Sequence, residues 1–128
     1  MITPFYAALF ALLLIALSVR TIRSRVRAQV AIGPGDDTEL LRAMRVQANF
    51  CEYIPMALIA MFFVETLWGS SFWLHVLGGP LIIGRLSHAW GVAQVRENLR
   101  YRQFGMAITF TVIFCSALAI LAHYLVNP

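Results

Sequence analysis

Residues 37–68, DTELLRAMRVQANFCEYIPMALIAMFFVETLW, decide the fold class. The stretch follows the helix breaker Gly33-Pro34-Gly35, and its polar first half gives way to a long apolar run. Asp36, followed three residues later by Glu39, fits a helix capping box. At 1.5 Å per residue a helix over 37–68 spans about 48 Å, more than the ~30 Å hydrocarbon core of a bilayer requires. The sequence therefore predicts a membrane helix whose first turns project beyond the bilayer.

Three further apolar stretches of membrane-spanning length accompany this one, and we expect helices at about 2–27, 72–95 and 103–126. Of the 128 residues, 60% are hydrophobic and only 12% are charged. A mean hydropathy of +0.75 lies outside the range usual for soluble domains. We predict an all-α membrane protein, a single transmembrane domain over 1–128 built as a four-helix bundle.

The arginines indicate how the bundle is oriented. All ten basic residues are arginine, and nine lie in the connections 20–45 and 96–102. The positive-inside rule places both connections in the cytoplasm and both termini outside.

No basic residue precedes the first apolar stretch, so we expect it to be a retained helix rather than a cleaved signal. Because the basic residues sit at membrane edges, without aromatic residues interleaved for base stacking, a nucleic-acid partner is excluded.

A polar stripe runs along the first half of the 37–68 helix. At 100° per residue its members fall within an arc about 100° wide: Arg42, Arg45, Asn49, Glu52 and Tyr53. On the next helix Arg85 and His88 are three residues apart and share a face. A rise of 1.5 Å per residue from the outer boundary puts Glu52, Arg85 and His88 at similar depths, about 20–24 Å in.

Charged side chains at that depth seldom face lipid, so Glu52 and Arg85 are expected to point into a bundle or an intersubunit cleft. A structural Glu–Arg pair that fixes helix register is one interpretation. The surplus of arginine over carboxylate favours another, an anion-binding site, because guanidinium groups bind carboxylates in bidentate fashion. Glu65, near the outer end of its helix, is expected to be interfacial. Neither cysteine nor histidine falls at a metal-ligand spacing, so we expect no metal.

Two runs of residues carry a family resemblance. Arg42-Ala-Met-Arg45-Val-Gln47-Ala-Asn49-Phe-Cys-Glu52-Tyr53-Ile-Pro55 resembles the signature of the MAPEG family, the membrane-associated proteins of eicosanoid and glutathione metabolism. Gly84-Arg85-Leu-Ser-His88-Ala-Trp-Gly91 resembles its third helix. The four-helix layout agrees along the whole chain, and the resemblance is to bacterial members.

The resemblance implies a homotrimer in the bacterial inner membrane, with glutathione as co-substrate bound at each subunit interface and the site opening to the cytoplasm. It implies a glutathione S-transferase or peroxidase acting on hydrophobic electrophiles that reach the enzyme through membrane lipid. The glutathione-binding residues carried over by position are Arg42, Arg45, Gln47, Asn49, Glu52, Tyr53, Arg85 and His88. An arginine near the start of the fourth helix would stabilise the thiolate, and Arg100 and Arg102 are the candidates.

Two departures from the family pattern keep alternatives open. Members with synthase activity usually carry tyrosine where this chain has Val92, and the spacing from Arg85 to the thiol-activating arginine is not preserved cleanly. A non-catalytic scaffold that binds a ligand or lipid is therefore the second hypothesis. A small multidrug transporter is the third, and it is disfavoured because the first helix carries no charge before Arg20.

Overall fold

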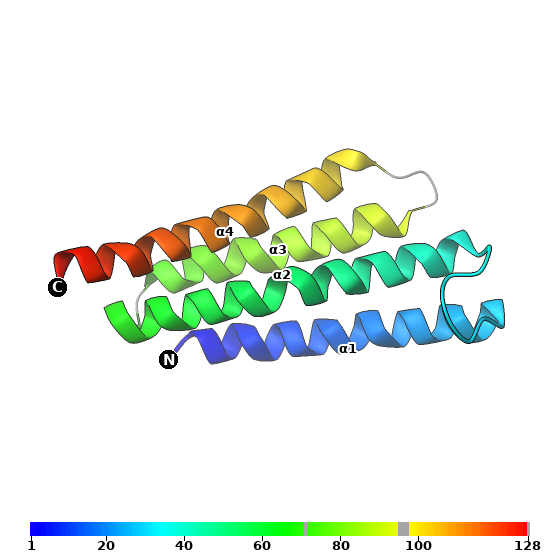
Figure 1. The fold of residues 1–128 in the computed structure, drawn as a ribbon, viewed down its shortest axis with the longest axis horizontal. Helices are drawn as coiled ribbons and strands as arrows, with labels where there is room; N and C mark the ends of the chain where they lie inside the picture. The colour runs from blue at the N-terminus through cyan, green and yellow to red at the C-terminus, as the bar shows by residue number, and fades with distance from the viewer. Residues whose placement is uncertain (71, 95–97, 128) are drawn as a thin grey trace.

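The computed structural model describes residues 1–70, 72–94 and 98–127. These residues form helices α1 (Thr3–Ala28), α2 (Thr38–Trp68), α3 (Phe72–Ala93) and α4 (Leu99–Val126). The helices run up and down side by side, with the N- and C-termini at one end and the α1–α2 loop at the other (Figure 1). The predicted all-α, four-helix fold is confirmed.

Hydropathy along the described helices agrees with a membrane protein. Helices α1, α2 and α4 are long and apolar enough to span a bilayer. Helix α3 is long enough, with 22 residues, but its mean hydropathy falls short of that criterion. A buried arginine, two histidines and a proline lower its hydropathy. Buried in the fold, Arg85 does not have to meet lipid.

Helix α2 lies at the centre of the bundle and packs against the other three. Its buried face contributes Phe50, Ile54 and Met61 to the core, which Phe10 of α1 and Leu81 of α3 complete. Phe10 and Phe50 meet with ring centroids 6.0 Å apart. Because α2 contacts every other helix, residues on its different faces have different tertiary partners.

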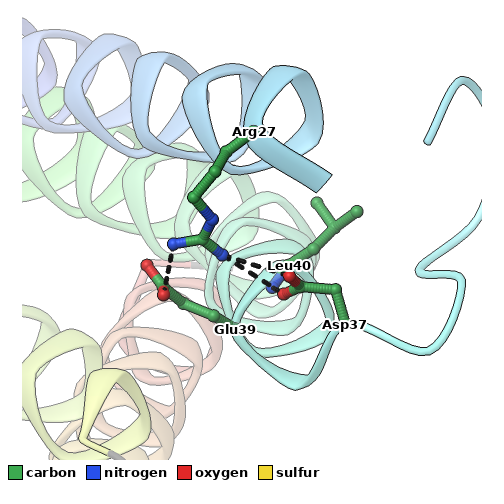
Figure 2. A network of polar contacts seen from close by, with 4 residues as sticks. All are labelled: Arg27, Asp37, Glu39 and Leu40. Atoms are coloured by element: carbon green, nitrogen blue, oxygen red, sulfur yellow. Dashed lines mark hydrogen bonds and ion pairs between the residues drawn. The ribbon is translucent and has the colours of Figure 1, made fainter. Parts of the chain in front are cut away.

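The start of α2 corrects the expected capping box. The N-cap is Asp37 rather than Asp36: its backbone is extended and its Oδ1 accepts a hydrogen bond from the Leu40 N–H at 2.7 Å. Glu39 does not reach back to close the box and instead accepts from Arg27 Nη1 at 2.5 Å. The same guanidinium reaches Asp37, so one arginine of α1 holds the first turn of α2 (Figure 2).

Helix α4 begins at Leu99, four residues before the expected start at 103. Asn98 causes the earlier start, since its side-chain oxygen accepts from the Arg100 N–H at 3.1 Å and caps the helix. Arg100 and Arg102 consequently stand on the first turn of α4 rather than in a loop. Helix α3 ends at Ala93, and the expected end at Val95 lies outside the described residues.

Glu65, which the sequence places near the outer membrane interface, is buried within the protein, with only 3% of the residue exposed. Its carboxylate accepts hydrogen bonds from the backbone N–H groups of Ile2 and of Thr3, the latter at 2.8 Å, and from the Ser70 hydroxyl at 2.5 Å. The first N–H groups of a helix have no partner within the helix. Glu65 therefore caps α1 from the far end of α2, where carboxylate charge also suits the helix dipole.

Glycine brings α3 and α4 into close contact. A Cβ atom placed on Gly105 would lie 2.3 Å from the Gly84 carbonyl oxygen and 2.7 Å from His88 Cβ. One on Gly91 would lie 2.8 Å from Tyr101 Cβ. Small residues at helix crossings let backbones approach closely in membranes, and here they bring the first turns of α4 up to the polar part of α3.

Candidate functional site

A cavity of about 580 Å³ opens beside the first half of α2. Helix α2 contributes most of its wall, with residues at the helical spacing of three and four: Thr38, Leu41, Arg42, Arg45, Ala48, Asn49 and Glu52. His88 and Val92 of α3 and Arg102 of α4 complete the lining. Four members of the polar stripe, Arg42, Arg45, Asn49 and Glu52, thus share one cavity with His88 of the third helix.

Charge in this cavity is strongly unbalanced. Of the described residues that line it, three carry guanidinium groups, Arg42, Arg45 and Arg102, and one carries a carboxylate, Glu52. These four side chains together carry two positive charges in excess. Asn49 and His88 add neutral hydrogen-bonding groups. Such a site suits a ligand that carries more than one anionic group and one cationic group.

Arg85 lies behind the wall and only 2% of it is exposed. Its Nη2 donates to Asn49 Oδ1 at 2.5 Å and its Nη1 donates to Thr109 Oγ1 at 3.3 Å. Thr109 in turn donates to the Gly105 carbonyl at 2.8 Å. Arg85 thus ties α2 to α4 and fixes the side chain of Asn49, which lines the cavity. The Glu–Arg pair considered from the sequence is replaced by this Arg–Asn contact.

Glu52 lines the same cavity as Asn49, the residue that Arg85 contacts. In the single chain Glu52 is exposed at a depth where a carboxylate facing lipid costs several kcal/mol. In a membrane this carboxylate therefore requires water in the cavity or another protein surface beside it.

Arg42 both lines the cavity and holds α3 in place. Its Nη1 donates to the carbonyl oxygens of Val92 at 3.3 Å and of Gln94 at 2.7 Å. The last carbonyls of a helix lack partners within it, and a cation there is favourable to the helix dipole. The mouth of the cavity is therefore tied to the C-terminal end of α3.

The two thiolate-stabilising candidates are distinguished by position. Arg102 lines the cavity, whereas Arg100 is exposed and is not part of the described lining. Gly91 lets the first turn of α4, which carries Arg102, pack closely on α3. A Cβ atom on Gly91 would lie only 3.2 Å from the Arg102 backbone nitrogen. Of the two candidates, Arg102 is the one that faces the polar wall of α2.

Besides Arg85, two expected site residues lie outside the described lining. Gln47 is on the side of α2 that packs on α1, where its Nε2 donates to Ser18 Oγ at 2.9 Å. Tyr53 packs its ring edge-on against Phe110 of α4, with centroids 5.3 Å apart. In the single chain, Gln47 and Tyr53 therefore fix the helices on either side of α2.

Sequence reasoning missed several members of the site. Leu41 and Ala48 fall on the same helical stripe as Arg45, so the periodicity that identified the arginines would also have identified them. Thr38 stands in the first turn of α2, beyond the start of the stripe considered. Thr109, which accepts from Arg85, gave no signal because its link to Arg85 spans 24 residues and depends on how α3 and α4 pack.

Comparison with known proteins gives concordant results. The sequence model of the MAPEG family matches residues 3–122. The inner membrane protein YecN of Escherichia coli strain K12 is 36% identical over 119 residues, which cover 93% of this chain and 89% of YecN. The YecN of Escherichia coli O6:H1 matches equally well.

Proposed function

Since the chain belongs to the MAPEG family and is an integral membrane protein, we propose that it binds glutathione in the α2 cavity and transfers it to lipophilic electrophiles. Many members of this family are glutathione transferases. One observation carries the proposal: in the part of the chain that the structure describes, three guanidinium groups and one carboxylate line the same cavity.

Glutathione at neutral pH carries two carboxylates, one ammonium group and one thiol. Its carboxylates match the arginines of the lining, and its ammonium matches Glu52. Asn49, held by Arg85, offers an amide to the peptide backbone of the ligand. This pairing neutralises each charge of the ligand, which the low dielectric at this depth requires.

Arg102 is the residue we assign to the thiol. A free thiol has a pKa of about 8.5, and a neighbouring guanidinium favours the thiolate, which is the nucleophile. The thiolate attacks an electrophilic carbon, the C–S bond forms as the leaving group departs with its electron pair, and the thiol proton passes to solvent. A hydroperoxide as the second substrate would make the same site a peroxidase.

Assembly as a homotrimer is part of the proposal. Exposure of the Glu52 carboxylate on the single chain supports a second subunit over this side of α2. The site then lies between subunits, and we infer from the arginine distribution that it opens toward the cytoplasm.

A thermal-shift experiment tests binding. Millimolar glutathione is expected to raise the Tm of the detergent-solubilised protein, since a ligand that binds only the native state stabilises it. Arg45→Ala and Glu52→Ala should abolish the shift, and Arg100→Ala, outside the lining, should keep it. No shift in the unaltered protein would overturn the proposal.

Turnover is tested separately with 1-chloro-2,4-dinitrobenzene, from which the thiolate displaces chloride. Arg102→Ala should lose conjugation and Arg100→Ala should retain it.

Val92 favours a second candidate function, a non-catalytic ligand- or lipid-binding scaffold, because an apolar side chain stands in the cavity wall where related synthases carry tyrosine. Binding of glutathione without conjugation of this and other electrophiles would support the scaffold.

A further inference from the structure

A second pocket, of about 330 Å³, lies along α1 where α1 meets the start of α2. Its lining is one stripe of α1 at helical spacing, joined by one residue of α2: Ala16, Val19, Arg20, Arg23, Ser24, Arg27 and Glu39. Among the described residues, it shares none with the α2 cavity. The proposed glutathione site leaves this cluster of arginines unexplained.

The arginines of α1 divide into two groups. Arg25 turns to the α1–α2 loop, where its Nη1 donates to three backbone carbonyls, including that of Gly33 at 3.0 Å. The guanidinium of Arg27 donates hydrogen bonds to the carboxylates of Asp37 and Glu39, as Figure 2 shows. Within the described part of the chain neither Arg20 nor Arg23 has a hydrogen-bond or ion-pair partner. The carboxylate that lines the pocket, Glu39, is bound to Arg27, so among the described residues no carboxylate pairs with the guanidinium groups of Arg20 and Arg23.

Depth along α1 relates these groups to the bilayer. From Thr3, a rise of 1.5 Å per residue puts Ala16 about 20 Å along the helix, Arg20 about 26 Å and Arg27 about 36 Å. With a hydrocarbon core of about 30 Å, Ala16 and Val19 lie at acyl-chain depth, and Arg20 and Arg23 lie where headgroups begin. An apolar floor beneath a basic rim matches the two parts of a phospholipid.

We propose that this pocket binds the phosphate group of an anionic phospholipid, with Arg20 and Arg23 as its ligands and the first acyl carbons against Ala16 and Val19. Guanidinium groups bind phosphate through paired N–H donors, and arginines at the cytoplasmic surface of a membrane attract anionic lipid. A soluble phosphate offers the same anionic chemistry but nothing for the apolar floor. The pocket is independent of the glutathione site, so either proposal can fail alone.

Native mass spectrometry of the full-length protein in neutral detergent tests the site by titration with dioleoyl-phosphatidylglycerol and, separately, dioleoyl-phosphatidylcholine. We expect phosphatidylglycerol to bind at least ~10-fold more tightly. The double variant Arg20→Gln/Arg23→Gln should weaken phosphatidylglycerol binding by about 25-fold, roughly 5-fold per arginine. The double lysine variant, Arg20→Lys/Arg23→Lys, should keep most of the affinity because it keeps the charge. Arg45→Gln, in the other cavity, should change nothing.

Each contrary result is informative. Equal affinity for the two lipids, or unaltered phosphatidylglycerol binding by a double glutamine variant with native circular dichroism, overturns the proposal. Glycerol 3-phosphate competing at the same concentration as phosphatidylglycerol would show that the acyl chain contributes nothing, which overturns the lipid assignment. Competition by glutathione would assign the pocket to the glutathione site instead. If the double glutamine variant does not fold, phosphatidylglycerol binding is measured at rising salt concentration for the unaltered protein and the double lysine variant. Binding that does not weaken with salt in either protein refutes the role of charge.

Discussion

Substitution of Gly105 by alanine is expected to separate α3 from α4. The added Cβ would lie 2.3 Å from the Gly84 carbonyl oxygen, 1.1 Å short of the 3.4 Å at which ordinary contact begins. It would also lie 2.7 Å from His88 Cβ. Because the first obstacle is backbone, no side-chain rotation relieves it, and the helices have to part by about 1 Å.

The loss of stability in Gly105→Ala follows from two opposing effects. Overpacking of this kind costs about 3 kcal/mol, the upper part of the usual range, because backbone has to move. The higher helix propensity of alanine returns about 1 kcal/mol. The net loss of about 2 kcal/mol corresponds to a fall in Tm of roughly 8 °C for a domain of this size.

The assay is thermal unfolding of the purified protein in detergent, followed by circular dichroism. Gly79→Ala is the matched control, since it is also a helical glycine and nothing lies within 4 Å of its added Cβ. Its Tm should stay level or rise by about 4 °C. Gly105→Ala should also weaken the glutathione-induced shift, because Arg102 moves with α4. A Tm for Gly105→Ala within about 2 °C of that for Gly79→Ala would refute the close packing.

Two further outcomes test the ends of the helices. Glu65→Gln should lower the free energy of unfolding by about 1–3 kcal/mol, because the N–H groups of Ile2 and Thr3 bond different carboxylate oxygens and an amide keeps only one acceptor oxygen; a Tm no lower than that of Glu39→Gln, which loses only an exposed ion pair, would contradict this. The Asp37 pKa is held below its ordinary value by the hydrogen bond from the Leu40 N–H and by the charge of Arg27. Its stabilising effect is therefore present above about pH 4 and lost as the pH falls through the lowered pKa; Asp37→Asn should flatten that part of a Tm-against-pH profile, and an unchanged profile would count against the cap.

Local pattern predicted much of the site. Helical periodicity placed Arg42, Arg45, Asn49 and Glu52 on one face of α2, and they do line one cavity. The same periodicity puts Gln47 on another face of α2, although the family resemblance implied a role in the site. The contact of Gln47 with Ser18 could not be predicted from either. The partner of Arg85 could not be read from the sequence, because its contact with Asn49 joins residues 36 positions apart.

The sequence alone determined that this is an all-helical membrane protein of the MAPEG type, since apolar length, arginine placement and the α2 signature are local properties of the chain. Tertiary structure decided which residues meet. It put Arg102 rather than Arg100 in the cavity, buried Glu65 under α1 and joined Arg85 to Asn49, a contact that the sequence did not indicate. The physical reason is that periodicity fixes the angle of a side chain about its own helix axis, whereas its partner depends on how closely and at what rotation the neighbouring helix packs.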